Sequence, residues 1–297
     1  MVHATVPASI VTASTPFERI AIIGVGLIGG SWGLALKKRG FAGVRVGCDR
    51  PEVLRKALAA GAIDEGEEDV RRAVKQADLI ILATPVSGIL RAIGELKNAA
   101  RPRALVTDVG STKVEICRRA RAVFGGEPIF LGGHPFAGRE RSGVENADAG
   151  LFENAVYVLT PEDSDHFADH RVKAFSEWIY AAGARRVVMD PATHDFAAAY
   201  LSHLPQLVST GLASLIAESE PLPLDLAASG FRDVTRLAES PYPVWQDICA
   251  SNLENILQAL DNFIRKLQSL RSHLTDGALE REFDQALRLR EKLREKN

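Results

Sequence analysis

Residues 19–39 read RIAIIGVGLIGGSWGLALKKR, and this stretch decides the fold. A short apolar run from Ile20 to Gly24 leads into the residues GVGLIGGS, and positions with helical spacing follow to Arg39. In a G-x-G-x-x-G turn the first glycine makes the tight turn, the second lets the backbone approach a pyrophosphate, and the third permits close packing of the helix. The helix N-terminus adds unpaired N–H groups that attract an anion. The stretch therefore predicts a strand, a turn and a helix that together bind a dinucleotide.

A carboxylate follows the second predicted strand. The run Val44 to Cys48 ends at Asp49, about twenty residues past the last glycine of the turn. A carboxylate at this place accepts hydrogen bonds from ribose hydroxyls and repels a 2′-phosphate, which favours NAD over NADP. Arg50 weakens this preference because a guanidinium could stack on adenine or meet a phosphate, so NADP stays open. A plain strand-to-helix turn is the alternative for the glycines, and the strand and helix on either side argue against it.

Short apolar runs alternate with longer stretches of helical spacing from Arg19 to about Asp190, which is the pattern of parallel strands joined by crossover helices. Such strands are continuously apolar because helices cover both faces of the sheet. The predicted strands are Ile20 to Gly24, Val44 to Cys48, Leu79 to Ala83, Ala104 to Thr107, Ile129 to Gly132, Ala155 to Leu159 and Arg186 to Met189. The fold class is therefore α/β, with a Rossmann-type, doubly wound parallel sheet.

Beyond Pro191 the pattern changes to helical spacing without further strands, over residues 192–217, 225–238, 242–270 and a charged stretch, 279–296. We therefore predict a loose tail over residues 1–17, a dinucleotide-binding domain over 18–190 and an all-helical domain over 191–297. Apolar positions between Leu253 and Leu270 need a partner surface, and a second copy of the chain could supply it. Solvated helices with a purely structural role are the simpler interpretation of the charged stretch.

Composition limits the possible partners. The chain has 297 residues, a net charge of −2 and a pI near 6.4, so nucleic acid and membrane surfaces are poor candidates. Its three cysteines, Cys48, Cys117 and Cys249, lie far apart, so we expect no disulfide framework and no metal site. No apolar run approaches the roughly 20 residues of a membrane span, and the first residues do not resemble a signal peptide. A reducing, cytoplasmic location fits these features.

A histidine stands in the run GGHPFAG, residues 132–138, after a predicted strand. Ligands bind at the carboxyl edge of such a sheet, where Thr84-Pro85 and Ser111 also follow strands. A dehydrogenase that oxidises an alcohol needs a base beside the hydroxyl, and imidazole suits the task because its pKa lies near neutrality. We therefore predict that His134 is the base. The predicted cofactor-binding residues are Gly24, Gly26, Leu27, Ile28, Gly29, Asp49, Arg50, Thr84 and Pro85.

The runs GVGLIGGS, CDR, ATP, DVGSTK, GGHPFAG, SHLP and DVTRLAES occur in this order, and together they resemble the prephenate/arogenate dehydrogenase family. The resemblance covers about residues 19–270. It implies a Rossmann domain followed by a helical dimerisation domain, and a homodimer with the active site between the domains. It also implies NAD-dependent oxidative decarboxylation of prephenate to 4-hydroxyphenylpyruvate in tyrosine biosynthesis, with arogenate as the alternative substrate.

Residues are carried over from the family by their motifs. His134 matches the histidine that takes the proton of the ring hydroxyl, and Ser111 matches the serine that orients it. Arg236 matches the arginine that binds the ring carboxylate, where a bidentate guanidinium suits the task. Trp245 and the segment Ser202-His203-Leu204-Pro205 are interpreted as pocket walls. Asp195 and Asp233 are expected to orient other groups, and His194 is expected to have a structural role, because nine positions on a helix place it opposite His203.

The sequence departs from the family pattern at two places that would face the substrate side chain. Gln206 stands where many members have histidine. Arg139, followed by Glu140, stands where many members have a threonine directly after the HPxAG motif. Arg139 either contacts a substrate carboxylate or is a solvated charge. Two other classes stay open: a β-hydroxyacid or imine reductase, which would be expected to place a lysine or aspartate on the first interdomain helix, and an NAD-sensing protein, which would need only the glycine turn.

Overall fold

The computed structural model describes residues 15–139, 141–219 and 222–295. Most of the predicted tail and Glu140 therefore lie outside the described residues. Phe17, at the end of that tail, is packed in the core with 1% of its surface exposed. The chain divides into two compact units, Met1–Asn252 and Leu253–Asn297. The domain boundary predicted at residues 190–191 falls inside the first unit and stays a prediction.

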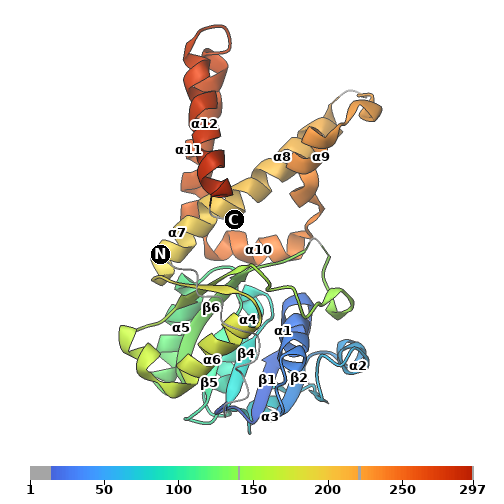
Figure 1. Ribbon diagram of the computed structural model, residues 1–297, viewed down its shortest axis with the longest axis vertical. Coiled ribbons are helices and arrows are strands. Elements are labelled where there is room, and N and C mark those ends of the chain that lie inside the picture. Colours follow the sequence, from blue (N-terminus) through green and yellow to red (C-terminus); the bar gives the residue numbers. More distant parts are fainter. Residues whose placement is uncertain (1–14, 140, 220–221, 296–297) are drawn as a thin grey trace. The chain divides into compact units, whose positions relative to one another are not determined.

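The first unit is built on an eight-stranded sheet with the order β3-β2-β1-β4-β5-β6-β7-β8 (Figure 1). Its strands are β1 Arg19–Ile23, β2 Val44–Cys48, β3 Glu65–Glu67, β4 Leu79–Leu82, β5 Leu105–Asp108, β6 Ile129–Phe136, β7 Val156–Thr160 and β8 Arg185–Val188. From β1 the successive strands β2 and β3 are added on one side, and β4 and the later strands are added on the other side. The switch point between β1 and β4 is where ligands bind in such folds. The predicted Rossmann-type sheet is confirmed.

Two features of the sheet differ from the prediction. β3 was not predicted, because its residues Glu65-Gly66-Glu67 form a short, polar edge strand without an apolar run. β7 runs antiparallel to β6, so the sheet is not wholly parallel. A buried antiparallel strand and a buried parallel strand carry the same apolar pattern, so the sequence did not distinguish them.

Helices cover both faces of the sheet, because alternate residues of each strand point to opposite faces. Ile20 and Ile22 pack with Trp32 of α1 and Phe175 of α6. Ala21 and Ile23, the residues between, pack on the other side in a second core with Ile89 of α4 and Ile116 of α5. The helices of this region are α1 Leu27–Lys38, α2 Pro51–Ala59, α3 Val70–Val74, α4 Val86–Leu96, α5 Val114–Phe124 and α6 His170–Ala181.

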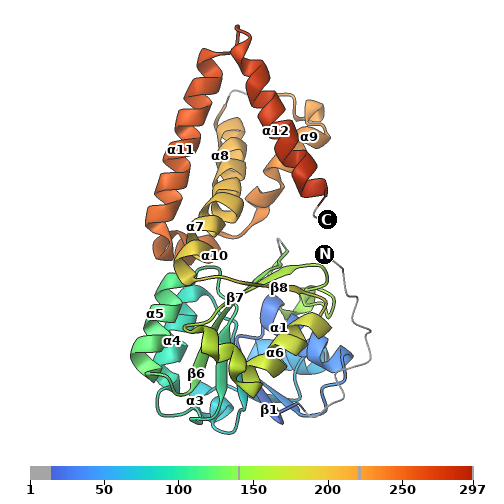
Figure 2. The ribbon, with the colours of Figure 1, turned by 60° about the vertical axis from the view of Figure 1, so that its left-hand side comes forward.

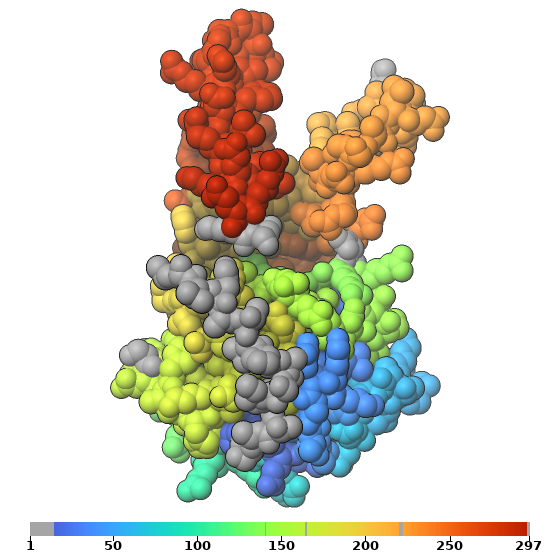
Figure 3. All heavy atoms as spheres, viewed as in Figure 1, coloured from blue at the N-terminus to red at the C-terminus, as the bar shows by residue number. Residues whose placement is uncertain are grey.

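The helical segments of the first unit follow the sheet. They are α7 Pro191–Ala198, a wide π turn Ala199–His203, α8 Leu204–Glu218, a 3₁₀ turn Leu224–Leu226, α9 Ser229–Thr235, a second 3₁₀ turn Arg236–Glu239 and α10 Tyr242–Ser251. Pro205 has no N–H for the carbonyl of Leu201 and its ring crowds that carbonyl, which accounts for the widened turn. In Figure 3 the segment from α8 to α9, in gold and orange, stands out from the sheet-containing body.

The second unit is a helical hairpin of α11 Leu253–Ser272 and α12 Ala278–Arg294, which run in opposite directions from the turn between them (Figure 2). Lys266 donates to Glu282 at 3.0 Å across the hairpin. The stretch predicted as one helix over 242–270 is interrupted at Asn252, whose φ of −129° and ψ of 30° are not helical. No helix among the described residues is long and apolar enough to cross a membrane.

Candidate active site

A pocket of about 550 Å³ lies in the first unit, against the carboxyl ends of β1, β4, β5 and β6. We call it the reacting pocket. Its sheet side includes Leu27 and Ile28 at the start of α1, Thr84 and Pro85 after β4, Ser111 after β5, and His134 to Arg139 at the end of β6 and beyond. Its helical side includes Ser202 in the π turn and Trp245 in α10. Nine of the predicted site residues thus line one pocket together with neighbouring residues: Leu27, Ile28, Thr84, Pro85, Ser111, His134, Arg139, Ser202 and Trp245.

A second cavity of about 370 Å³, which we call the distal pocket, shares walls with the reacting pocket at Arg139, Ser202 and Trp245. It adds two residues that do not line the reacting pocket, Gln206 from α8 and Arg236 from the 3₁₀ turn. The two pockets are therefore neighbours, with His134 and Ser111 at one end and Gln206 and Arg236 at the other. A ligand that spans both can meet an imidazole at one end and a guanidinium at the other.

The glycine turn fits a dinucleotide. Gly24 has a φ of +92°, which favours glycine, and a Cβ there would lie 2.8 Å from the Ala83 backbone. A Cβ on Gly26 would meet nothing within 4 Å, so open space lies over the N-terminus of α1. A Cβ on Gly29 would lie 2.0 Å from the Gly24 carbonyl oxygen, so only glycine allows this approach of helix to turn. The three glycines have the geometry that the fingerprint requires.

The other predicted cofactor residues surround this turn. Asp49 accepts hydrogen bonds from the backbone N–H groups of Val25, at 2.9 Å, and Arg50, at 2.8 Å, so its carboxylate is held beside the glycine turn. The Arg50 side chain is 75% exposed and approaches Glu52 at 3.4 Å. Thr84 lines the reacting pocket and has a buried hydroxyl without a hydrogen-bond partner among the described residues, and a ligand group could supply one.

His134 lies in β6, where the strand continues past its pairing with β5 and pairs with β7 instead. Its Nδ1 lies 2.8 Å from Nε2 of His194, and Nδ1 of His194 lies 2.7 Å from Oδ1 of Asp195. Burial, followed by the charges of His194, Lys113 and His203, holds the pKa of His134 well below its ordinary value of 6.5. His134 is therefore neutral at pH 7 and able to accept a proton.

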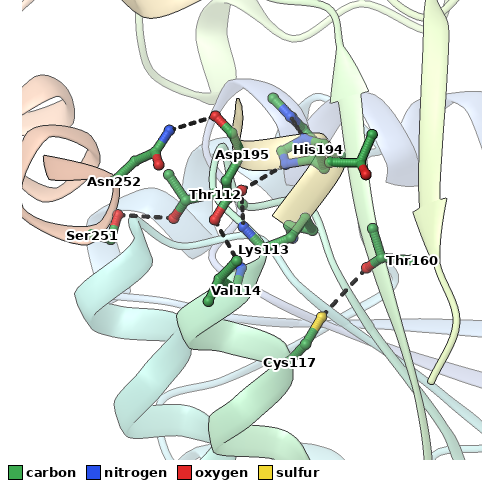
Figure 4. A network of polar contacts seen from close by, with 12 residues as sticks. Thr112, Lys113, Val114, Cys117, Thr160, His194, Asp195, Ser251 and Asn252 are labelled. Carbon is green, nitrogen blue, oxygen red and sulfur yellow. Dashed lines mark hydrogen bonds and ion pairs between the residues drawn. The ribbon is translucent and has the colours of Figure 1, made fainter. Parts of the chain in front are cut away.

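Asp195 is the centre of a buried network (Figure 4). Its carboxylate accepts hydrogen bonds from the backbone N–H groups of Lys113, at 2.7 Å, and Val114, at 2.9 Å, at the start of α5. Its backbone carbonyl accepts a hydrogen bond from Nδ2 of Asn252 at 2.8 Å. The side chain is 1% exposed. Asp195 thus joins the sheet region, α7 and the end of α10.

A buried ion pair holds the backbone next to both predicted reacting residues. Lys113 Nζ donates to Asp108 and, at 2.7 Å, to the carbonyl of Gly133. Asp108 accepts hydrogen bonds from the N–H groups of Gly133, at 3.0 Å, and Gly110, at 2.8 Å. Gly133 precedes His134 and Gly110 precedes Ser111. The ion pair therefore fixes the positions of β6 and of the loop after β5 relative to each other.

His203 was predicted to line the pocket, and the structure places it behind the wall. It is 1% exposed and lies edge-to-face with Trp245 at 5.9 Å between ring centroids. Its Nδ1 lies 3.3 Å from Nδ2 of Asn252. Burial lowers the pKa of His203 to about 4, with Asp195 opposing and His194 adding to the shift. His203 therefore supports Trp245 rather than presenting a charge to a ligand.

The remaining predicted residues are less buried than His134 and His203 or lie outside the described residues. Arg139 donates to Asp148 at 2.6 Å and is half-exposed while lining both pockets. Ser111 lines the reacting pocket, but no hydrogen bond joins its side chain to His134 among the described residues. Arg236 is exposed on the distal pocket and Asp233 is exposed on α9. Glu140 lies outside the described residues.

Sequence reasoning missed the partners of His134. His194 was expected to be structural because an ideal helix places it opposite His203, but the π turn between them changes that phase. The adjacent pair His194-Asp195, directly after the strands, was the available signal. Among the described residues, no cluster of three or more histidine, cysteine, aspartate or glutamate side chains could hold a metal ion.

A glycine turn at the switch point of a Rossmann-type sheet, with a neutral buried histidine in a pocket closed by helices, defines a nicotinamide-dependent dehydrogenase. Two family models match: "Prephenate dehydrogenase, nucleotide-binding domain" over residues 32–188 and "Prephenate dehydrogenase, dimerization domain" over residues 190–293. The chain therefore belongs to the prephenate dehydrogenase family. The two matches favour this family over the β-hydroxyacid or imine reductase alternative.

Individual relatives agree with this assignment. Prephenate dehydrogenase of Lactococcus lactis subsp. cremoris is 36% identical over 282 residues, which are 92% of this chain and 77% of that protein. The crystal structure of A. aeolicus prephenate dehydrogenase in complex with hydroxyphenyl propionate and NAD⁺ matches with a TM-score of 0.84 and 30% identity, over 95% of this chain and 99% of that one. Synechocystis arogenate dehydrogenase matches with a TM-score of 0.76 and 31% identity, over 93% of this chain and 99% of that one.

Proposed function

We propose that the protein oxidises prephenate with NAD⁺ and releases CO₂ and 4-hydroxyphenylpyruvate. The observation that carries the proposal is the pair of neighbouring pockets, with a neutral His134 in the reacting pocket and Arg236 in the distal pocket. Prephenate has a matching arrangement, because its hydroxyl and its ring carboxylate stand on opposite carbons of a six-membered ring. The family assignment supports the same reaction.

NAD⁺ bound along the glycine turn would supply the hydride acceptor, with Gly24, Gly26 and Gly29 at its pyrophosphate and Asp49 at its ribose. His134 takes the hydroxyl proton as the carbinol carbon is oxidised. Loss of CO₂ then leaves electrons on the new carbonyl oxygen, and protonated His134 returns the proton to give the phenol. The proton balance therefore closes on one residue, and no second acid is required.

Arg236 would hold the ring carboxylate until CO₂ departs, because a guanidinium presents two parallel N–H donors to a carboxylate. Ser111 lines the reacting pocket beside His134 and would orient the substrate hydroxyl. Trp245, packed on His203, lines both pockets and would exclude water from the ring. Arg139 would meet the side-chain carboxylate with the part of its guanidinium that Asp148 leaves unused.

Arogenate is a second candidate substrate, and Gln206 favours it. Gln206 Nε2 donates to the carbonyl of Leu237 at 2.7 Å and approaches Oγ1 of Thr210 at 3.2 Å. A carbonyl oxygen can only accept, so the orientation of the amide is fixed and Oε1 is the group left for a ligand. An acceptor at this position suits the ammonium group of arogenate, whereas the keto oxygen of prephenate would face a second acceptor.

We infer a homodimer assembled through the segment that matches the dimerisation family model, residues 190–293. Exposed apolar side chains on the segments from α8 to α12 support it, because they need cover: Leu215 is 60% exposed, Leu226 is 79% exposed and Phe283 is 70% exposed. A cytoplasmic location is part of the same proposal, because the three cysteines are free thiols that a reducing compartment preserves.

A steady-state assay tests the proposal. Prephenate and arogenate are each paired with NAD⁺ and NADP⁺, and formation of the reduced nicotinamide is followed by its absorbance. We expect turnover of at least one acid, with NAD⁺ preferred because of Asp49. A higher kcat/KM for arogenate would identify Gln206 as the residue to exchange. No turnover of either acid by folded protein that binds NAD⁺ would reject the proposal and favour the NAD-sensing alternative.

A further inference from the structure

The hydrogen bonds from His134 to Asp195 have a direction that the chemistry of the groups determines. The ionised carboxylate of Asp195 can only accept, so Nδ1 of His194 must carry the proton between them. When the ring of His194 carries this proton alone, its other nitrogen is an acceptor. Nδ1 of His134, 2.8 Å away, must therefore be the donor in that pair.

We propose that His194 and Asp195 are positioning residues that fix His134 as the Nδ1–H tautomer and so leave its Nε2 as the base facing the reacting pocket. Nε2 has no hydrogen-bond partner among the described residues, and His134 lines the pocket. The arrangement parallels the role of an aspartate that holds a catalytic histidine in one tautomer. Here a second imidazole stands between the carboxylate and the base.

The carboxylate is itself fixed. Two backbone N–H groups at the start of α5 donate to its two oxygens, from Lys113 and Val114. These bonds occupy the lone pairs that face α5. The direction that remains open points to His194. The carboxylate of Asp195 therefore cannot rotate away from His194, and it remains the acceptor for Nδ1–H of His194.

A second buried histidine supplies an internal contrast. Asn252 Nδ2 donates to the carbonyl of Asp195, which fixes the amide orientation, and the same Nδ2 lies 3.3 Å from Nδ1 of His203. An amide nitrogen cannot accept, so Nδ1 of His203 must be the acceptor and its Nε2 must carry the proton. The structure thus assigns opposite tautomers to His134 and His203, both of which are buried.

The consequence for the reaction rests on the proposed function. When Nε2 of His134 takes the hydroxyl proton, the imidazolium that forms still donates through Nδ1 to His194. The negative charge of Asp195 lies one imidazole away and stabilises the cation in a site that excludes water. After decarboxylation, Nε2 gives the proton back and the tautomer is restored without rotation of the ring.

Nitrogen-15 NMR of the full chain labelled at histidine tests the tautomers without substrate, so the result does not depend on which acid is turned over. Spectra are recorded near pH 8, and the resonances are assigned with single-histidine variants. We expect the proton on Nδ1 of His134 and His194 and on Nε2 of His203. A proton on Nε2 of His134 would overturn the proposal.

The variants His194→Leu and His194→Gln separate positioning from packing. In His194→Leu we expect the His134 proton to distribute over both nitrogens and kcat to fall on the order of 10²-fold, with little change in NAD⁺ affinity. Glutamine can place an amide oxygen near the position of Nε2, so His194→Gln should recover part of the Nδ1–H form and of kcat. His203→Leu, another buried histidine on the same helical segment, should leave the His134 tautomer unchanged. An unchanged tautomer in His194→Leu would contradict the proposal.

Discussion

The reacting pocket and the distal pocket share a wall, yet they are built from different kinds of structure. Around His134, charged groups such as Lys113, Asp108 and Asp195 are fully buried and each is bonded to a partner. At the distal end, Arg236 is exposed on a short turn and Gln206 is held by one carbonyl and one hydroxyl. The contrast indicates that proton transfer depends on a rigid, dry network, whereas substrate choice depends on a few side chains that can change without disturbing the sheet.

The largest effect should come from the base itself. We expect His134→Asn to fold and to bind NAD⁺ normally while kcat falls by about 10² to 10⁴, the usual effect of losing a positioned base. Steady-state kinetics, with NAD⁺ affinity measured by titration, check this. Near-normal kcat would remove His134 from the mechanism and would end the distinction between the two pockets.

Stability should differ between the ends. Lys113→Met leaves Asp108 buried without its counter-charge and should lower the free energy of unfolding by about 3–5 kcal/mol. Arg236→Met, at an exposed position, should change it by less than about 0.5 kcal/mol. Chemical denaturation of both variants against wild type gives the comparison. Equal losses of stability in the two variants would show that the ends are not built differently.

Replacement of Arg236 should lower activity although it leaves the stability of the protein nearly unchanged. We expect Arg236→Met to keep its fold and to lose kcat/KM by roughly 10²-fold, because about 3 kcal/mol of charge-assisted hydrogen bonding to a carboxylate is removed. Arg236→Lys should recover part of this loss, since it restores the charge but not the two parallel donors. Unchanged kcat/KM in the methionine variant would place the carboxylate elsewhere.

Substrate choice should respond to the distal pocket alone. Gln206→His replaces the fixed acceptor with a group that can donate, so the ratio of kcat/KM for arogenate to that for prephenate should fall about tenfold, a difference near 1.4 kcal/mol. The His134 tautomer should be unchanged. Gln206→Glu, which keeps acceptors and adds charge, is the matched control and should move the ratio in the opposite direction.

The smallest effect concerns pH. Because burial holds the pKa of His134 below 6.5, the base is already unprotonated at neutral pH. Between pH 7 and pH 8 kcat/KM should therefore change by less than about twofold, and it should fall only as the pH drops through the lowered pKa and the imidazole is protonated. A steep rise of kcat/KM between pH 7 and pH 8 would mean that the reacting pocket is wetter than its burial indicates.

The fold followed from the sequence wherever a residue pattern has one structural solution. The glycine turn needed only three glycines between a strand and a helix, and Gly24, Gly26 and Gly29 have the geometry expected of them. The direction of β7 could not be predicted, because covering helices make every buried strand apolar whichever way it runs. The strand β3 was not predicted, because pairing at a sheet edge requires no apolar side chains.

The site was less accessible to sequence reasoning than the fold. His134 and Ser111 stand in distinctive motifs, and both line the reacting pocket. The partnership of His194 with His134 depends on a contact between residues sixty positions apart, and no local spacing records it. An ideal helix also misplaces His194 relative to His203, because one widened turn shifts the phase of everything after it.

The length of that widened turn, Ala199–His203, sets the position of Gln206 relative to His194 and Asp195. An α-helix rotates by about 100° per residue, so removal of one residue from the turn would rotate α8 relative to α7 and move Gln206 relative to the distal pocket. The residues before the turn, His194 and Asp195, would keep their bonds to the sheet region. A deletion of Leu201 should therefore alter which acid is accepted before it alters the proton chemistry, and single-residue insertions and deletions here offer a route by which new substrates could arise on an unchanged catalytic base.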